Sequence, residues 1–157
     1  MILNKKTFLF FLFLLFFSAK VFCQDLQLES SRIEVDLTNQ KLYVLKENLR
    51  VFEFLISSGQ YPGSTPKGIF RVFSMGKKSI SPNYNNAVLL NYLAFTYSKK
   101  NYPIAIHALN YSSYEKKLGH PASHGCVRVS RKDSKTLFSW VINYKKSNNQ
   151  YPQIYIY

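Results

Sequence analysis

The stretch "RIEVDLTNQKLYVLKENLRVFEFLIS", residues 32–57, carries three β-strand signals in close succession. In its first part, Ile33, Val35 and Leu37 alternate with polar residues, which is the two-residue period of a strand with one buried face. Two short polar turns, at residues 39–40 and 47–48, separate this part from two further apolar segments. Because strands joined by such turns form hairpins, the stretch predicts an antiparallel meander of three strands.

Further strand signals follow on either side of two polar loops. The loops are residues 58–68 and 76–86, which are rich in glycine, proline, serine and asparagine. The other predicted strands are apolar or aromatic, and they comprise residues 69–73, 87–97, 102–110 and 153–157.

One helix is predicted near the C-terminal end. Ser130 is suited to cap it, with Asp133 three residues later, and Leu137, Trp140 and Val141 form one apolar face at helical spacing. Many short strands with a single helix indicate a mainly β domain, either a sandwich or a barrel-like fold. No linker or internal repeat divides the chain, so we expect one domain.

The N-terminus has the features of an export signal. A basic start, Lys5–Lys6, precedes an apolar run over residues 7–19, which Lys20 ends before it reaches the ~20 residues that span a bilayer. The sequence therefore predicts a signal peptide over residues 1–23, a domain over 24–157 with its core at about 32–157, and a periplasmic or wall-facing protein. An uncleaved membrane anchor and a lipoprotein acylated at Cys23 are the alternatives.

Removal of this leader would leave Cys126 as the single internal cysteine. The chain has two cysteines, and the other one, Cys23, lies at the expected cleavage point. No internal disulfide is then possible, although exported proteins usually pair their cysteines. A lone thiol in an oxidising compartment is either used chemically or buried as a structural residue.

The charge balance is strongly basic, with 21 lysines and arginines against 8 acidic residues. Without the three lysines of the leader, a net charge of +10 remains on the mature chain. Such a charge favours an anionic partner, but export and the scattered lysine pairs argue against nucleic acid. An anionic cell wall surface is the expected partner, and a solvated surface without a specific partner is the alternative.

All three histidines of the chain, His107, His120 and His124, precede Cys126 within a short window. A cysteine nucleophile needs a base, and histidine is the usual one. His124 is too close along the chain to reach the sulfur easily, whereas His107 ends a predicted strand that can bring it alongside. We therefore predict that His107 is the base of a Cys126 nucleophile.

The glycine that precedes Cys126, Gly125, also favours a catalytic role for this segment. A residue without a side chain admits a substrate carbonyl, and its backbone N–H can bind a developing oxyanion together with that of Cys126. A zinc site formed by the three histidines and Cys126 is an alternative with suitable ligand types. Its spacing matches no zinc module known to us, and a loop position is expected for His120, so we predict no metal.

Residues 119–130, "GHPASHGCVRVS", resemble the active-site signature of the bacterial L,D-transpeptidase catalytic domain, or YkuD domain. In that signature a histidine is followed, after somewhat under twenty residues, by Ser/Thr-His-Gly-Cys, and here His107 precedes Cys126 by 19 positions. The opening hairpin, the Thr-Pro-x-Gly segment at Thr65–Gly68 and the helix after the cysteine are also similar. The likeness covers about residues 32–157.

The resemblance implies a β-rich fold and roles for particular residues. Cys126 would be the nucleophile and His107 its base, with the ring oriented by the backbone carbonyl of Ala108. The backbone N–H groups of His124, Gly125 and Cys126 would form the oxyanion hole. The remaining site residues would bind substrate or shape its pocket, and these are Ser123, His124, Arg128 and Tyr92. Alanine at position 108 departs from the glycine or serine of most relatives.

The implied activity is acyl transfer on peptidoglycan stem peptides, without a metal or cofactor. A thioester would form at the carbonyl of the third residue with release of D-alanine, and an amine would then resolve it. An L,D-carboxypeptidase, which uses water as acceptor, is the close alternative, and a catalytically inactive wall-binding protein is the alternative from another class. The acceptor and the preferred diamino acid do not follow from the sequence.

Overall fold

A computed structural model describes residues 27–157, which form one curled sheet and one α-helix. The nine strands lie in the order β4-β9-β1-β2-β3-β8-β7-β6-β5. Their bounds are β1 Arg32–Asp36, β2 Lys41–Lys46, β3 Leu49–Ser57, β4 Gly68–Arg71, β5 Ser74–Ser81, β6 Ala87–Tyr97, β7 Pro103–Ala108, β8 Val127–Val129 and β9 Gln153–Ile156. Two short 3₁₀ helices, η1 (Pro82–Tyr84) and η2 (Ser112–Lys117), lie in the connections.

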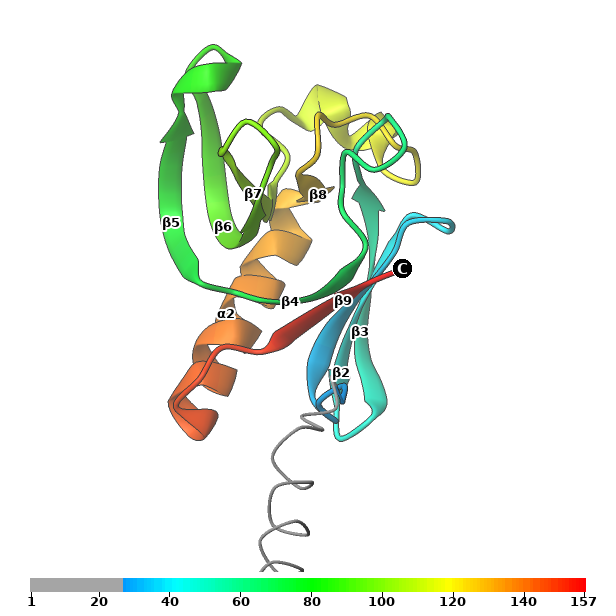
Figure 1. The fold of residues 1–157 in the computed structure, drawn as a ribbon, viewed down its shortest axis with the longest axis vertical. Coiled ribbons are helices and arrows are strands. Elements are labelled where there is room, and N and C mark those ends of the chain that lie inside the picture. The colour runs from blue at the N-terminus through cyan, green and yellow to red at the C-terminus, as the bar shows by residue number, and fades with distance from the viewer. Residues whose placement is uncertain (1–26) are drawn as a thin grey trace, which may run out of the picture.

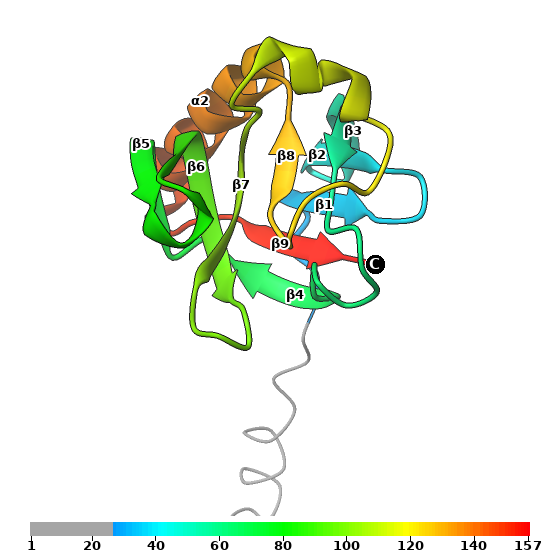
Figure 2. The ribbon, with the colours of Figure 1, turned by 90° about the horizontal axis from the view of Figure 1, so that it is seen from above.

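The sheet bends until its two ends approach one another. Viewed from above, the strands follow an arc from β4 through β8 to β5, and α2 lies against β6 and β7 (Figure 2). At the closing point the Phe73 N–H donates to the Ala94 carbonyl at 2.9 Å. The Phe70 and Phe95 rings also pack with their centroids 5.4 Å apart. The prediction of a mainly β domain is confirmed, and the architecture is the barrel-like one.

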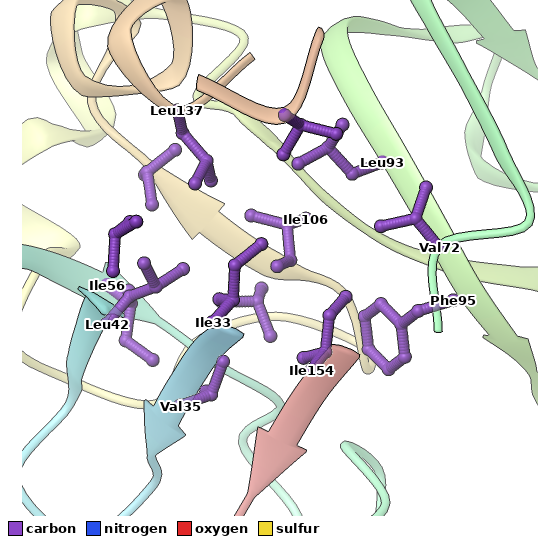
Figure 3. Close-up of a cluster of buried hydrophobic side chains, with 14 of the residues drawn as sticks. Ile33, Val35, Leu42, Ile56, Val72, Leu93, Phe95, Ile106, Leu137 and Ile154 are labelled. Atoms are coloured by element: carbon purple, nitrogen blue, oxygen red, sulfur yellow. The ribbon is translucent and has the colours of Figure 1, made fainter. Parts of the chain in front are cut away.

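The predicted meander forms as β1, β2 and β3. Its register pairs Ile33 with Val44 and Val35 with Leu42, so that the apolar residues of neighbouring strands share one face. These four side chains are fully buried, and they share one core with Ile154 of the neighbouring β9, Ile106 of β7 and Leu137 of α2 (Figure 3). The apolar residues of the alternation therefore face the core, whereas Glu34 and Asp36 lie on the other face of β1 and are also buried.

The single described α-helix is α2, Arg131–Asn148, which follows the strand after Cys126 as predicted. Ser130 caps it, since its hydroxyl oxygen accepts the Asp133 N–H at 3.0 Å and its O–H donates to the Asp133 carboxylate at 2.6 Å. Leu137 and Val141 are buried against the core, and Trp140 packs at its edge. The helix contacts β6 and β7, the strands behind the cavity described below (Figure 1).

Two elements differ from the sequence-based expectation. Residues 76–86 were expected to form a polar loop, which is wrong for residues 76–81, because Ser74–Ser81 is strand β5; η1 and a turn follow it over residues 82–86. This strand lies at the sheet edge and pairs only with β6, so lysines at 77 and 78 can face solvent and leave little apolar periodicity. Strand β8, of three residues, was not anticipated either, because it depends on pairing with β7 and β3.

The predicted signal peptide, residues 1–23, lies outside the described residues. Within residues 27–157, no helix has the length and apolar character needed to cross a membrane.

Candidate active site

The parallel pairing of β7 with β8 brings His107 and Cys126 together. In this ladder Ile106 is paired with Val127 and His107 with Arg128, so Cys126 lies just before the first paired residue of β8. Residues paired in register point to the same side of a sheet. His107, Cys126 and Arg128 all line one cavity of about 430 Å³.

The walls of this cavity come from the β5–β6 hairpin tip, from the connection between β6 and β7 with the start of β7, and from the segment that follows β7. The hairpin tip and the segment after β7 lie at the same end of the molecule, the upper end in Figure 1. The walls are rich in tyrosine and contain no aspartate, glutamate or lysine. The lining residues are Ser81, Tyr84, Asn85, Ala87, Leu89, Ser98, Tyr102, Pro103, Ile104, His107, Asn110, Tyr111, Tyr114, His124, Gly125, Cys126 and Arg128.

The His107 imidazole is buried and oriented by the backbone. Its Nδ1 lies 2.8 Å from the Ala108 carbonyl oxygen, and because a carbonyl only accepts, Nδ1 carries the proton and Nε2 is the basic nitrogen. Burial lowers the pKa of His107 to about 4; the hydrogen bond to Ala108 opposes this change and the positive Arg128 adds to it. At neutral pH the ring is therefore an uncharged base.

The Cys126 thiol is also in its neutral form. Burial raises the pKa of this thiol, although a backbone hydrogen bond from Ala105 and the charge of Arg128 act in the opposite direction. The resting pair is thus a thiol and a neutral imidazole, in contrast to a thiolate–imidazolium pair. Such a pair reacts by proton transfer at the moment of attack.

We predict that the neutral form of the Cys126 thiol can be detected in the pH dependence of its alkylation. Iodoacetamide should modify Cys126 slowly at neutral pH, and the rate should rise only above the pKa of an ordinary cysteine, about 8.5. Mass spectrometry of the labelled protein between pH 5 and 10 measures this rate, with free cysteine as the reference thiol. A rate that is already constant between pH 5 and 8 would show a preformed thiolate and contradict the prediction.

The turn before Cys126 is closed by the Ser123 side chain. The Ser123 hydroxyl donates to the Cys126 carbonyl at 2.5 Å and accepts the Gly125 N–H at 3.0 Å. Ser123 is buried and does not line the cavity. Because the Gly125 N–H is used within the turn, the backbone donors left for an oxyanion are those of His124 and Cys126.

A second loop, residues 58–67, fixes this turn from outside the cavity. The carbonyl oxygen of Ser58 accepts the N–H groups of Ala122 and Ser123 at 2.9 and 2.8 Å. The buried Thr65 hydroxyl donates to the Gly125 carbonyl at 2.7 Å and accepts the Gly59 N–H at 2.9 Å. No role was predicted for Thr65 from the sequence, since its partner is 60 residues away.

Arg128 and His124 lie at the cavity with different surroundings. The Arg128 guanidinium donates to the Ala122 carbonyl at 3.1 Å, and within residues 27–157 no carboxylate forms an ion pair with it. The exposed His124 ring stacks on Tyr84 from the β5–β6 tip, with centroids 5.1 Å apart. This stack joins the hairpin tip to the turn that carries Cys126.

Two further residues singled out from the sequence, Tyr92 and His120, are not among those that line the cavity. Tyr92, expected in the acyl-donor groove, is not among the lining residues; its ring lies against Gly76 of the neighbouring strand, where a Cβ atom would approach it to 2.8 Å. The aromatic walls are instead Tyr84, Tyr102, Tyr111 and Tyr114. His120 is exposed in a loop, and in the described part of the chain no three metal-ligating side chains cluster, so the zinc alternative has no geometric support.

Solved structures with this fold are L,D-transpeptidases. The chain shares 21% identity with one from Stackebrandtia nassauensis (TM-score 0.65, covering 88% of this chain and 62% of that one). It shares 14% with one from Mycobacterium smegmatis (0.65, 82% and 58%), and 15% with LdtMt1 in complex with imipenem (0.66, 82% and 59%). At these identities the likeness establishes the fold, and the chain spans about six-tenths of the length of those proteins.

No curated protein matches the chain. The family comparison is decisive, since residues 30–147 match the L,D-transpeptidase catalytic domain, YkuD. This range includes the meander β1–β3, the strands β7 and β8 that position His107 and Cys126, and nearly all of α2. The chain therefore belongs to the L,D-transpeptidase catalytic domain family.

Proposed function

We propose that the protein is a cysteine-dependent L,D-transpeptidase that acts on peptidoglycan stem peptides. The observation that carries this proposal is the single cavity into which Cys126 and the neutral base His107 both open. A thiol in the same cavity as an uncharged imidazole can carry out acyl transfer, because the imidazole can accept the thiol proton during attack. Membership of the family supports the choice of substrate.

In the first half-reaction, the Cys126 sulfur attacks the carbonyl carbon of the third residue of a stem, a diamino acid. The thiol proton passes to Nε2 of His107 as the carbon–sulfur bond forms. The carbonyl oxygen takes up the negative charge, which the N–H groups of His124 and Cys126 stabilise. The carbon–nitrogen bond to the terminal D-alanine then breaks, His107 gives its proton to the leaving amine, and a thioester remains.

In the second half-reaction, an amine of a neighbouring stem attacks the thioester. His107 accepts the amine proton and returns a proton to the sulfur, so that a cross-link forms and the free thiol is restored. If water attacked the thioester in place of the amine, the protein would be an L,D-carboxypeptidase. If it catalysed neither reaction, it would be an inactive wall-binding protein.

Arg128 indicates that the acyl donor is anionic. It is the one formal positive charge on the described cavity wall, no acidic residue lines that wall, and burial lowers its pKa. A half-buried cation without a carboxylate partner favours a ligand that brings one. The terminal carboxylate of a stem, or a carboxylate on its diamino acid, meets this requirement.

We predict that Arg128 favours anionic reagents at Cys126. In the wild type, iodoacetate should react faster relative to iodoacetamide than it does with free cysteine, and Arg128→Gln should lower that ratio about tenfold, since one charge within a few ångströms is worth about 1–2 kcal/mol in a screened site. Rates of adduct formation by mass spectrometry give the ratio. Arg50→Gln, a change at a remote arginine on β3, is the control and should leave it unchanged. An unchanged ratio in Arg128→Gln would contradict the assignment.

Export and association with an anionic wall are further parts of the proposal. The apolar leader and the net charge of +13 on the full chain support them. One relative of this fold is known in complex with imipenem. On this basis we propose that a carbapenem acylates Cys126 here as well.

The proposed activity is tested by incubating the protein with purified tetrapeptide stems and identifying the products by mass spectrometry. Cross-linked dimers would establish transpeptidation, and tripeptides alone would establish the carboxypeptidase. Stems that remain unchanged, together with an unmodified Cys126 after exposure to imipenem, would refute catalysis at this site.

A further inference from the structure

Thr65 lies outside the cavity but is bonded directly to the nucleophile turn. It is 3% exposed, and its hydroxyl donates one hydrogen bond and accepts another within the protein. It accepts from the Gly59 N–H, which fixes the hydroxyl proton toward the Gly125 carbonyl at 2.7 Å. A buried, fully satisfied hydroxyl of this kind specifies one geometry for the groups that it joins.

The Gly125 carbonyl belongs to the same peptide unit as the Cys126 N–H. No cis peptide bond occurs in the described chain, and in a trans unit the carbonyl and the N–H point in opposite directions. Gly125 and Cys126 line the cavity, whereas Thr65 does not. A carbonyl drawn toward Thr65 therefore directs the Cys126 N–H to the opposite side, where the thiol meets its substrate.

The loop that carries Thr65 is itself firmly placed. The Gln40 side chain bonds to Ser58 twice, accepting its N–H at 2.9 Å and donating to its hydroxyl at 2.7 Å. The Gln60 N–H donates to the Ser123 carbonyl at 2.9 Å, and Gly59 forms a bridge with Ser123. Because these bonds hold the loop independently of Thr65, loss of the Thr65 hydroxyl removes one constraint and leaves the loop in place.

We propose that Thr65 is a positioning residue for acyl transfer, whose hydroxyl orients the Gly125–Cys126 peptide so that the Cys126 N–H serves as an oxyanion donor. The inference rests on the proposed acyl transfer at Cys126. It predicts a specific defect, since only reactions that place negative charge on a carbonyl oxygen need this donor. Displacement of iodide by the thiol develops no oxyanion and should not depend on it.

The test compares two reactions of Cys126 in the same preparations. Acylation by 4-nitrophenyl acetate forms the thioester and releases 4-nitrophenolate, and alkylation by iodoacetamide forms a thioether and releases iodide. In both reactions the thiol proton passes to His107. In Thr65→Val, acylation should slow at least tenfold and alkylation should change less than twofold, because removal of an oxyanion donor costs about 10²–10³ in rate. Thr65→Ser retains the hydroxyl and should restore acylation to within about threefold.

Ser64→Ala is the matched control, because it removes a hydroxyl from the same loop that bonds only to the Tyr61 carbonyl. It should leave both rates unchanged. Equal slowing of acylation and alkylation in Thr65→Val would indicate general disorder of the turn and overturn the inference, as would acylation at the wild-type rate. If the wild type reacts with the ester but leaves stems unchanged, the proposed substrate fails while the role of Thr65 stands.

Discussion

Cys126→Ala and His107→Ala are each expected to abolish turnover of stem peptides and to leave the fold intact. The first change removes the nucleophile, and the second removes the neutral base that lies in the same cavity. Residues of such a unit act together, so either loss alone should reduce kcat by about 10⁴ or more. Mass spectrometry of the products measures the activity, and circular dichroism with urea unfolding measures the fold. Activity at the wild-type level in either variant would defeat the mechanism.

The low pKa of His107 also predicts how kcat/KM and stability depend on pH. Since burial lowers it to about 4, the ring remains an uncharged base at every pH above that value. We expect kcat/KM to fall as the pH drops through about 4, whereas an ordinary histidine would give an acid limb near 6.5. Between these values the unfolded chain binds a proton that the native ring does not, so stability rises with pH across this window. His107→Ala should remove that contribution.

Gly125→Ala is expected to disable the site through the backbone. The glycine has a φ of +146°, and an added Cβ would lie 2.7 Å from the Ser64 carbonyl oxygen. Neither the turn nor the loop that carries Thr65 can yield without moving the Cys126 N–H. We expect kcat to fall at least 10²-fold, by analogy with the loss of an oxyanion donor, and stability to fall by about 1–3 kcal/mol.

Gly63→Ala is the control for Gly125→Ala, because it adds a side chain at a positive φ without adding a close contact. Gly63 also has a positive φ, of +75°, but no atom lies within 4 Å of its added Cβ. It should lose about 1–2 kcal/mol of stability and keep full turnover. Kinetics with stem peptides and urea unfolding of both variants give the two quantities. Full activity in Gly125→Ala would mean that the turn accommodates a side chain, contrary to the structure.

The parts of the fold that were predicted correctly are those specified by local patterns. The meander was visible because Ile33 and Val35 alternate with polar neighbours and short turns bound each strand. Helix α2 was visible because its cap, Ser130, and its apolar face lie within a few residues of one another. Both patterns act over distances shorter than a single element, so they can be read without knowledge of the partners.

Strands β5 and β8 were missed because their stability comes from partners. Lys77 and Lys78 give β5 the composition of a loop, and its pairing with β6 at the sheet edge makes it a strand. The three residues of β8 are too few to show any period, and they become a strand between β7 and β3. For such segments tertiary pairing overrides local preference.

The candidate site also contains residues that could be predicted from the sequence and residues that could not. His107 and Cys126 were selected from the sequence because few residue types can act as base and nucleophile, and each has few copies in the chain. His124, Gly125 and Arg128 were selected as well, and all three line the cavity, whereas other residues of the site were not selected. Tyr92 was expected in the donor groove, but its ring faces Gly76, while Thr65 and the tyrosines of the walls arrive from distant segments.

The sequence by itself determined the chemistry of this protein, namely a thiol, an imidazole and a glycine-containing turn on a mainly β domain. Only the tertiary structure decided how those groups are tuned. Burial makes both His107 and Cys126 neutral at rest, the Ser123 hydroxyl takes up the Gly125 N–H, and Thr65 aligns the next peptide unit. Solvation and hydrogen-bond direction depend on every segment that packs around a group, and for this reason no local pattern can specify them.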